Sequence, residues 1–202
     1  MARTDVASKR MRYNYQDEQG EGWAGKLLLE TLEVAVITTL VFLLARVFVQ
    51  NYQVDGPSMT PTLLNGQYII VNKAVYFTHT PQRGDVIVFQ FPSDPNRDLV
   101  KRVIGVPGDT VVTNDTNGSV TVNGVTLVEP YVNDHINSAS QTWKVGPGDY
   151  FVMGDNRGDS YDSRDWGLLP AKDIIGEAVF VYWPFNNIHS LQNWSGVFSK
   201  VP

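Results

Sequence analysis

The chain of 202 residues contains no cysteine. This absence excludes disulfide bonds, thiolate zinc sites and every enzyme that attacks its substrate with a cysteine, sortase-type transpeptidases included. Charged residues are also scarce, at 18% against 43% hydrophobic residues, so most of the chain is not intrinsically disordered. Basic residues are in the minority, with 16 Lys and Arg against 21 Asp and Glu. A general affinity for nucleic acid therefore has no support, and we expect no nucleic-acid partner.

The length and the mass of 22.6 kDa suit one domain of ordinary size with an appendage or a small insert. Residues 1–26 are polar and mix Lys and Arg with Asp and Glu without a hydrophobic period. We therefore predict that residues 1–26 form a flexible tail.

A long apolar segment follows the tail, from Leu27 to Val49. Its 23 residues are enough to cross a hydrocarbon core, for which about 20 helical residues are needed. The uninterrupted apolar centre, Val34–Ala45, has only 12 residues. Three charged side chains lie in the outer turns, where they could snorkel: Glu30, Glu33 and Arg46. We predict a transmembrane helix over residues 27–49, and the alternative is an amphipathic or core helix.

The charges around this span predict its orientation. Five Lys and Arg residues precede it, whereas residues 47–72 contain none. By the positive-inside rule, the N-terminus lies in the cytoplasm and residues 50–202 lie outside. We expect an anchor rather than a cleaved signal peptide, because the span is far from Met1 and no small-x-small pattern follows it. The chain is thus predicted to be a single-pass protein of the cell membrane.

Residues 50–202 have the pattern of a β-rich domain. Short runs of β-branched and aromatic residues alternate with Gly and Pro, and no second long helix is expected. Asn123-Gly124 lies between two valine-rich runs and predicts a hairpin with a type I′ turn. This hairpin lies within residues 114–144, a stretch rich in Asn, Thr and Ser that we expect to form a smaller insert. The expected strands cover residues 68–72, 85–91, 99–106, 110–113, 120–122, 125–128, 150–153 and 178–183.

A serine is held in a turn by glycine and prolines in the segment Gly56-Pro57-Ser58-Met59-Thr60-Pro61-Thr62-Leu63. A rigid turn can present a hydroxyl to a substrate, although a plain turn serine has the same surroundings. Ser58 follows Val49 by nine residues, so at about 3.5 Å per residue it lies within about 30 Å of the expected membrane edge. Any chemistry of Ser58 would therefore take place near the bilayer.

Two cations stand among hydrophobic residues in the segment 99–109, Leu-Val-Lys-Arg-Val-Ile-Gly-Val-Pro-Gly-Asp. Strand alternation puts Lys101 on one face and Arg102 on the other, and both faces are mostly apolar. Desolvation lowers the pKa of a lysine and can leave a neutral amine that takes a proton from a serine, whereas an arginine suits a structural ion pair. Lys101 is the candidate base, and the alternative is a snorkelling or salt-bridged lysine.

Short polar side chains crowd residues 153–167, directly after an expected apolar strand. The segment is Met-Gly-Asp-Asn-Arg-Gly-Asp-Ser-Tyr-Asp-Ser-Arg-Asp-Trp-Gly. Carboxylates, amides and hydroxyls at this density can form a network that fixes loops and orients a catalytic amine. A fourth segment, residues 83–89, opens a buried strand with the turn Arg-Gly-Asp, and we interpret it as structural.

The order of these four segments resembles that of bacterial type I signal peptidases, the membrane-anchored Ser/Lys endopeptidases that remove signal peptides. The resemblance covers about residues 27–185 and implies a mainly β, signal-peptidase-like domain after one N-terminal transmembrane helix. It implies that Ser58, in Ser-Met-x-Pro-Thr-Leu, is the nucleophile. It also implies that Lys101, in Lys-Arg-Val-x-Gly-x-Pro-Gly-Asp, is the general base. Lysine at this position is typical of the bacterial form, since archaeal and endoplasmic-reticulum relatives carry histidine there.

The resemblance also implies supporting roles. Ser160 corresponds to the serine that orients the lysine, and Asp162 and Arg164 correspond to a supporting ion pair. Met59 and Gly56 are expected to line the site. Some relatives have, in place of Gly56, a serine that helps to stabilise the oxyanion, so here only backbone N–H groups near the nucleophile carry over.

The implied partners are exported precursor proteins with a signal peptide and the lipid bilayer. Small side chains are implied at the first and third positions before the cut, in an extended segment that adds as a strand along a β-edge. No metal and no organic cofactor is implied. We expect core packing for most of the late aromatic residues, although they could also rest on a bilayer: Trp183, Phe185, Trp194 and Phe198.

Three other interpretations fit parts of the sequence. A Ser-His-Asp protease would use one of three histidines, but none lies in a dense polar segment and no two approach metal-ligand spacing: His79, His135 and His189. Arg157-Gly158-Asp159 and Arg83-Gly84-Asp85 are adhesion-type tripeptides, although short tripeptides arise by chance. A self-cleaving repressor type of Ser/Lys peptidase would be soluble, which the expected anchor argues against.

Overall fold

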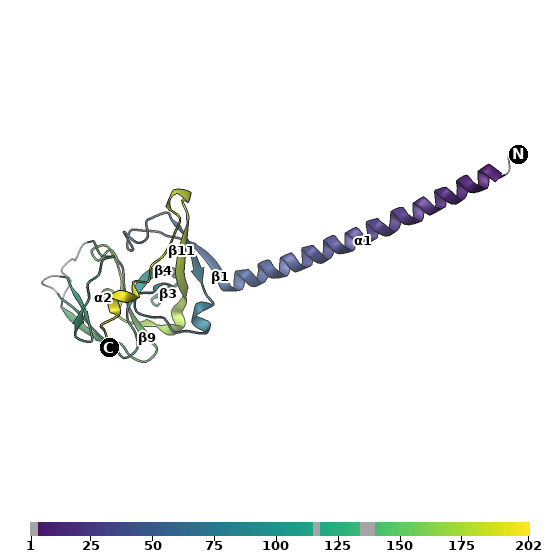
Figure 1. Cartoon of the computed structure of the whole chain (residues 1–202). Helices are drawn as coiled ribbons and strands as arrows, with labels where there is room; N and C mark the ends of the chain where they lie inside the picture. Colours follow the sequence, from purple (N-terminus) through teal and green to yellow (C-terminus); the bar gives the residue numbers. More distant parts are fainter. Residues whose placement is uncertain (1–3, 115–117, 134–139) are drawn as a thin grey trace. The chain divides into compact units, whose positions relative to one another are not determined.

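The computed structural model describes residues 4–114, 118–133 and 140–202 (Figure 1). The chain divides into two compact units after Val47. The first unit consists of most of the helix α1 (Thr4–Phe48). The second unit, Phe48–Pro202, is mainly β, as the sequence predicted, and its described residues contain no long helix.

Helix α1 runs through residues 4–26, for which the sequence analysis predicted a flexible tail. These residues include Lys, Arg, Glu and Gln, which favour helices, and the chain has no proline before Pro57 that would interrupt the helix. The part Trp23–Phe48 is long and apolar enough to cross a membrane, with a mean hydropathy of 2.2 over its most apolar window. None of that window is buried in the protein, whereas a core helix would be mostly buried.

The larger sheet of the β-domain is antiparallel throughout, with the strand order β1-β2-β11-β3-β4-β9-β10 and with β12 beside β11. The sequence analysis did not predict β1, β10 and β12, of which β10 and β12 have two residues each. The strands are β1 (Val49–Gln53), β2 (Tyr68–Asn72), β3 (Val86–Phe91), β4 (Asp94–Gly105), β9 (Asp149–Met153), β10 (Leu169–Pro170), β11 (Ile174–Trp183) and β12 (His189–Ser190).

A smaller antiparallel sheet has the strand order β7-β6-β5-β8. Val122 pairs with Val125, and Asn123 and Gly124 between them have positive φ values of 50° and 82°. These values confirm the predicted type I′ hairpin. The sheet already begins at Thr110, and residues 115–117 and 134–139 of the expected insert lie outside the described residues. Its strands are β5 (Thr110–Thr113), β6 (Val120–Val122), β7 (Val125–Thr126) and β8 (Gln141–Lys144).

Strands β3 and β4 lie inside the larger sheet (Figure 1). Both faces are buried along most of β3 and at the end of β4 from Lys101 to Gly105, which explains the nearly continuous apolar sequence of β3. On one face of β3, Val86 and Val88 belong to the same core cluster as Met59 and Leu63, and this packing holds the turn that contains Ser58 against the sheet. Strand β4 pairs with β3 as far as Arg102 and with β9 only from Arg102 onward. The part of β4 before Arg102 therefore has one edge that no described strand covers.

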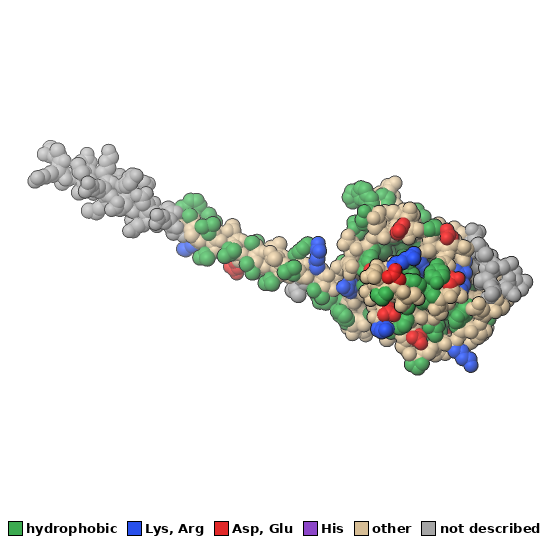
Figure 2. Space-filling model, turned by 180° about the vertical axis from the view of Figure 1, so that it is seen from behind, with side chains coloured by type: hydrophobic (Ala, Val, Ile, Leu, Met, Phe, Trp, Pro, Cys, Tyr) green, Lys and Arg blue, Asp and Glu red, His purple; other side chains and the backbone are tan. Residues whose placement is uncertain are grey.

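Hydrophobic side chains are exposed at the turn between β11 and β12. Trp183, Phe185 and Ile188 are 43%, 74% and 48% exposed. Figure 2 shows hydrophobic side chains at the tip of this turn, which protrudes from the β-domain. Core packing was expected for most of the late aromatic residues; it is found for Phe198, whereas Trp183 and Phe185 are exposed because the tip of this turn extends beyond the core. The remaining helices are short: η1 (Val75–Phe77), α2 (Ser163–Trp166), η2 (Ala171–Asp173), η3 (Phe185–Asn187) and η4 (Ser195–Phe198).

Candidate active site

Ser58 lies in a tight turn after β1, and hydrogen bonds fix the backbone of this turn. The Thr60 N–H donates to the Pro57 carbonyl at 3.0 Å within the turn. From the 153–167 segment, the Asn156 N–H donates to the Ser58 carbonyl at 3.1 Å, and Asn156 Nδ2 donates to the Pro57 carbonyl at 3.2 Å. Gly56 enters the turn with a φ of 93°, which favours glycine. The turn thus presents a half-buried Ser58 side chain in a defined place.

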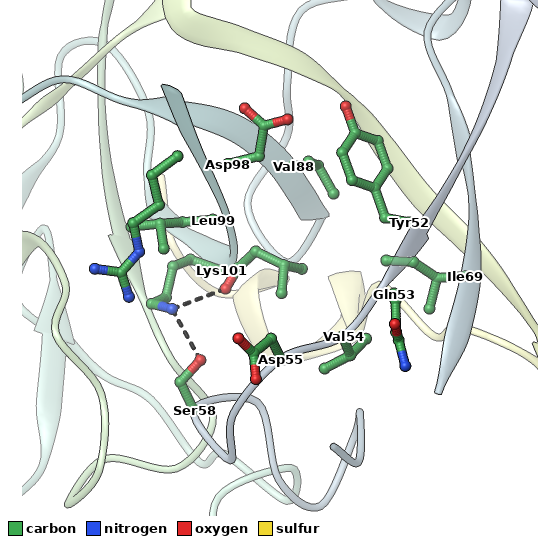
Figure 3. A pocket seen from close by; sticks show the side chains of 12 residues that line it. Tyr52, Gln53, Val54, Asp55, Ser58, Ile69, Val88, Asp98, Leu99 and Lys101 are labelled. Carbon is green, nitrogen blue, oxygen red and sulfur yellow. Dashed lines mark hydrogen bonds between the residues drawn. The ribbon is translucent and has the colours of Figure 1, made fainter. Parts of the chain in front are cut away.

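Lys101 points from β4 toward Ser58 (Figure 3). Its Nζ donates to Ser58 Oγ at 2.9 Å and to the Val100 carbonyl at 2.9 Å. Only 3% of Lys101 is exposed. The residues that the sequence analysis named as nucleophile and base, 43 positions apart in the chain, are therefore in direct contact.

The pKa of Lys101 is lowered from 10.5 to about 8. Burial is the largest cause, because it penalises the charged form. The carboxylates of Asp162 and Asp155 oppose this change, whereas the cation of Arg97 adds to it. Among the described residues, no carboxylate forms an ion pair with Lys101, so no described contact supports the alternative of a salt-bridged lysine. A substantial fraction of neutral amine near pH 8 makes Lys101 able to accept a proton.

Asp162 is the centre of the supporting cluster. Its carboxylate pairs with Arg164 at an Nε–Oδ1 distance of 2.8 Å and accepts hydrogen bonds from Ser160 Oγ at 2.8 Å and the Gly154 N–H at 3.0 Å. Burial acts to raise the pKa of Asp162, but these partners outweigh burial and hold the pKa below its usual value. Asp162 also caps α2, since it accepts a hydrogen bond from the Arg164 N–H. The implied ion pair of Asp162 and Arg164 is present.

The Ser160 hydroxyl bonds to Asp162 and not to Lys101 in the part of the chain that the structure describes. The hydrogen bonds of the described residues include none between Ser160 and Lys101. Gly154 allows the segments to approach closely, because a Cβ there would collide with Ser160 Oγ and with the Ser58 carbonyl oxygen. An orienting role of Ser160 toward Lys101 stays a prediction, and the observed contacts route it through the Asp162 carboxylate.

Met59 and Gly56, which were expected to line the site, do not line the cavity beside Ser58. The Met59 side chain is fully buried because it packs into the core beneath the serine turn. Gly56 has no side chain and contributes its positive φ to the turn. In the structure both residues shape the turn.

Arg102 is fully buried and forms the ion pair that the sequence analysis expected for the second cation of β4. Its guanidinium meets the Asp155 carboxylate at 2.7 Å, and Nη1 donates to the Gly84 carbonyl at 2.7 Å. Thr62 Oγ1 donates to the same carboxylate at 2.5 Å. Asp155 therefore ties the serine turn, through Thr62, to β4 and to the 153–167 segment.

A second buried ion pair, between Arg157 and Glu129, was not predicted. Arg157 Nη1 donates to Glu129 Oε2 at 2.9 Å, and the Tyr131 hydroxyl donates to Glu129 Oε1 at 2.8 Å. In the sequence, only the position of Glu129 directly after the run Val125–Val128 indicated a buried carboxylate. Its partner Arg157 lies in a different segment of the chain. Arg157 is only 3% exposed, so the tripeptide that begins with it cannot present its arginine to an adhesion partner.

Neither of the two histidines that the structure describes hydrogen-bonds to Ser58. His79 bonds to the adjacent residue, and His189 Nδ1 bonds to the Asn187 carbonyl at 2.9 Å, so neither contacts Ser58. His135 lies outside the described residues. Within the described ranges, no group of three His, Cys, Asp or Glu side chains is placed to hold a metal ion.

A cavity of about 170 Å³ opens beside Ser58 and Lys101 (Figure 3). One wall is the segment from Tyr52 to Asp55, and the opposite wall is the segment of β4 from Arg97 to Lys101. Ile69 and Val88 contribute apolar surface. Because the dyad lies at this cavity, a bound chain there would bring a peptide bond to Ser58.

Comparison with known proteins supports the resemblance. The family described as "Signal peptidase, peptidase S26" matches residues 28–183. The chain belongs to this signal peptidase family. It is 37% identical over 185 residues to "Probable signal peptidase I-1" of Synechocystis sp., with 88% of this chain and 91% of the relative covered. It is 38% identical over 180 residues to "Signal peptidase IB" of Staphylococcus aureus, with 80% of this chain and 92% of the relative covered.

A solved structure of a signal peptidase I from Enterococcus faecalis V583 is also similar to the chain. The two sequences are 34% identical, and the match covers 49% of this chain and 97% of that chain with a TM-score of 0.43.

Proposed function

We propose that the chain is a signal peptidase I that cleaves signal peptides from exported precursors, with Ser58 as nucleophile and Lys101 as general base. One observation carries this proposal: Nζ of Lys101 lies 2.9 Å from Oγ of Ser58, and the pKa of this buried amine is lowered to about 8. Membership of the signal peptidase family supports the substrate class.

The reaction proceeds through an acyl-enzyme. The neutral amine of Lys101 takes the hydroxyl proton while Ser58 Oγ attacks the carbonyl carbon of the scissile peptide bond. Backbone N–H groups near Ser58 stabilise the oxyanion. The C–N bond then breaks, and the Lys101 ammonium gives its proton to the leaving amine of the mature protein. A water molecule, deprotonated by Lys101, hydrolyses the ester and releases the signal peptide.

The substrate binds as an extended strand in the cavity. Residues Arg97 to Lys101 belong to the part of β4 whose one edge no described strand covers, and they line the cavity that contains Ser58. An added peptide strand at such an edge gains backbone hydrogen bonds, while its side chains alternate between the two sides. The small side chains beside the cut follow from membership of the signal peptidase family.

The helix α1 anchors the protein in the cell membrane with residues 50–202 outside. The apolar part Trp23–Phe48 has the length and the hydropathy of a membrane span. The Lys and Arg residues before the span support a cytoplasmic N-terminus. The exposed Trp183, Phe185 and Ile188 are the kind of side chains that rest at a bilayer interface.

Cleavage of a precursor by detergent-purified protein tests the proposal. The precursor carries an Ala-x-Ala site, and sequencing of the N-terminus of the product identifies the cut. The parent should cleave after the second Ala, and Ser58→Ala should have no measurable activity. Ser199→Ala, at an exposed serine that does not line the cavity, is the matched control and should cleave at the parental rate. Cleavage by Ser58→Ala within tenfold of the parent would refute the assignment of the nucleophile.

A further inference from the structure

The cavity beside the dyad carries charged side chains that take no part in the proton transfers of the proposed mechanism. Arg97 and Asp98 stand on the β4 wall, and Asp55 stands on the opposite wall, three residues before the nucleophile. Figure 3 shows Asp55 at the side of the cavity where Ser58 and Lys101 lie, and Asp98 at the other side.

The backbone on either side of Asp55 is held in place. The Val54 N–H donates to the Gln67 carbonyl at 2.8 Å, and the Val54 side chain is buried, with 5% exposed. On the other side, the Gly56 N–H donates to Asn65 Oδ1 at 2.9 Å. Val54 and Asp55 both line the cavity, and Figure 3 shows Asp55 on the side of the cavity where Ser58 lies. The fold therefore holds the backbone around Asp55 in place, at a wall of the cavity.

Asp55 differs in its contacts from Asp98, the other carboxylate that lines the cavity. Asp98 lies next to Tyr52, whose pKa is raised to about 12 by burial and by this carboxylate. Among the described residues, Asp55 has no hydrogen bond and no ion pair from its side chain, and Arg97 is not within ion-pair distance of it. Asp55 thus has no ion-pair partner among the described residues, and its exposed side chain lines the cavity beside Ser58.

We propose that Asp55 selects precursors by charge: it favours a basic over an acidic side chain at one of two positions close to the scissile bond, the residue between the two alanines or the first residue of the mature protein. A peptide strand in the cavity lies between the two walls, so it separates Asp55 from Arg97 and exchanges water for substrate around the carboxylate. Like charges repel and opposite charges attract more strongly when water is partly excluded. For a partly exposed pair we expect a preference of about three- to tenfold in kcat/KM. This inference rests on the proposed function, because it concerns the same cavity and the same reaction.

The test uses two series of precursors that share one Ala-x-Ala site. In the first series the residue between the two alanines is Lys, Asn or Asp, and in the second series the first residue of the mature protein is Lys, Asn or Asp. The measured quantity is the ratio of kcat/KM for the Lys precursor to kcat/KM for the Asp precursor. It is compared between the parent, Asp55→Asn and Asp55→Lys. Asp173→Asn, which removes the same charge outside the cavity lining, is the matched control.

In at least one series, the parent should prefer the Lys precursor about three- to tenfold. Asp55→Asn should bring the ratio close to one, Asp55→Lys should invert it, and Asp173→Asn should keep the parental ratio. Raising the salt concentration should reduce the ratio in the parent, because exposed charges are screened.

A parental ratio of one in both series, or a ratio that Asp55→Asn does not change, would overturn the inference. The Asn precursors report the proposed function separately. If the parent cleaves them and Ser58→Ala does not, the proposed function stands whatever the ratios show. If the parent does not cleave them, the proposed function itself fails.

Discussion

Replacement of Lys101 by arginine separates the role of a base from the role of a charge. Arginine keeps the positive charge and much of the apolar stem, but it does not give up its proton at any workable pH. If Lys101 is the base, Lys101→Arg should lower kcat by at least about 10²-fold, within the ~10²- to 10⁴-fold range of general-base loss. If Lys101 served only as a structural cation, the variant would retain substantial activity.

The lowered pKa of Lys101 adds a quantitative expectation for the parent. With a pKa of about 8, about a tenth of the amine is neutral at pH 7 and about half at pH 8. With the ordinary value of 10.5, the neutral fraction at pH 7 would be about 300-fold smaller. The value of kcat/KM should therefore rise about tenfold per pH unit on the acid side and level off above pH 9, because the neutral amine is the reactive form.

The assay measures cleavage of one precursor between pH 6 and pH 10 under conditions where the chemical step limits the rate. Circular dichroism of Lys101→Arg checks that this variant is folded. Arg97→Gln removes a cation that helps to lower the pKa, so its acid limb should move to higher pH, whereas Arg97→Lys should keep the parental limb. Retained activity in folded Lys101→Arg, or a parental profile that is flat below pH 8, would refute the Ser/Lys mechanism.

Three further substitutions test the structure around the dyad, and one proteolysis experiment tests the orientation in the membrane. Lys101→Met should be inactive. At pH 7 its unfolding free energy, measured by urea unfolding, should exceed that of the parent by up to about 3 kcal/mol, because the parent buries an amine whose pKa is lower in the folded than in the unfolded state. By the same linkage, the unfolding free energy of the parent should rise between pH 8 and pH 10.5, where the unfolded state binds more protons, and Lys101→Met should lack this rise. Gly154→Ala should lower kcat at least tenfold when the rate is expressed per folded enzyme molecule, because the added Cβ would collide with the Ser58 carbonyl oxygen. A parental kcat in this variant would contradict the close approach of the two segments. Asp162→Asn should lower the unfolding free energy by about 3 kcal/mol, since it leaves a mostly buried guanidinium without its carboxylate; a loss below about 1 kcal/mol would contradict this role. Protease added to intact spheroplasts should degrade residues 50–202, and protection of these residues until lysis would reverse the proposed orientation.

Local sequence was sufficient for the features that depend on neighbouring residues. Length and continuous apolar character predicted the helix over Leu27–Val49, which the structure ends at Phe48. The Asn123-Gly124 turn was predictable because positive φ at both positions is a property of these residue types. The polar stretch of residues 1–26 was expected to be a flexible tail, and the structure continues α1 back to Thr4; the flexibility of this stretch stays a prediction.

The sequence also identified the two reacting side chains, but only through the order of its motifs. Nothing in the local sequence shows that Lys101 and Ser58 meet, because the contact spans 43 residues and depends on the packing of the serine turn against the sheet. The depressed pKa has the same origin, since desolvation is a property of the assembled core and not of the residues adjacent to Lys101 in the chain.

Tertiary structure alone decided how the polar segment after β9 supports the site. Ser160 has the expected place in the motif, yet its hydroxyl bonds to Asp162, and the charge of Asp162 acts on Lys101. The buried pair of Arg157 and Glu129 could not be predicted, because its members come from separate parts of the chain. A buried charge requires a partner, but only the fold determines which one is near. The sequence by itself thus determined the residue types that can react, whereas the fold determined their distances, their burial and hence their protonation.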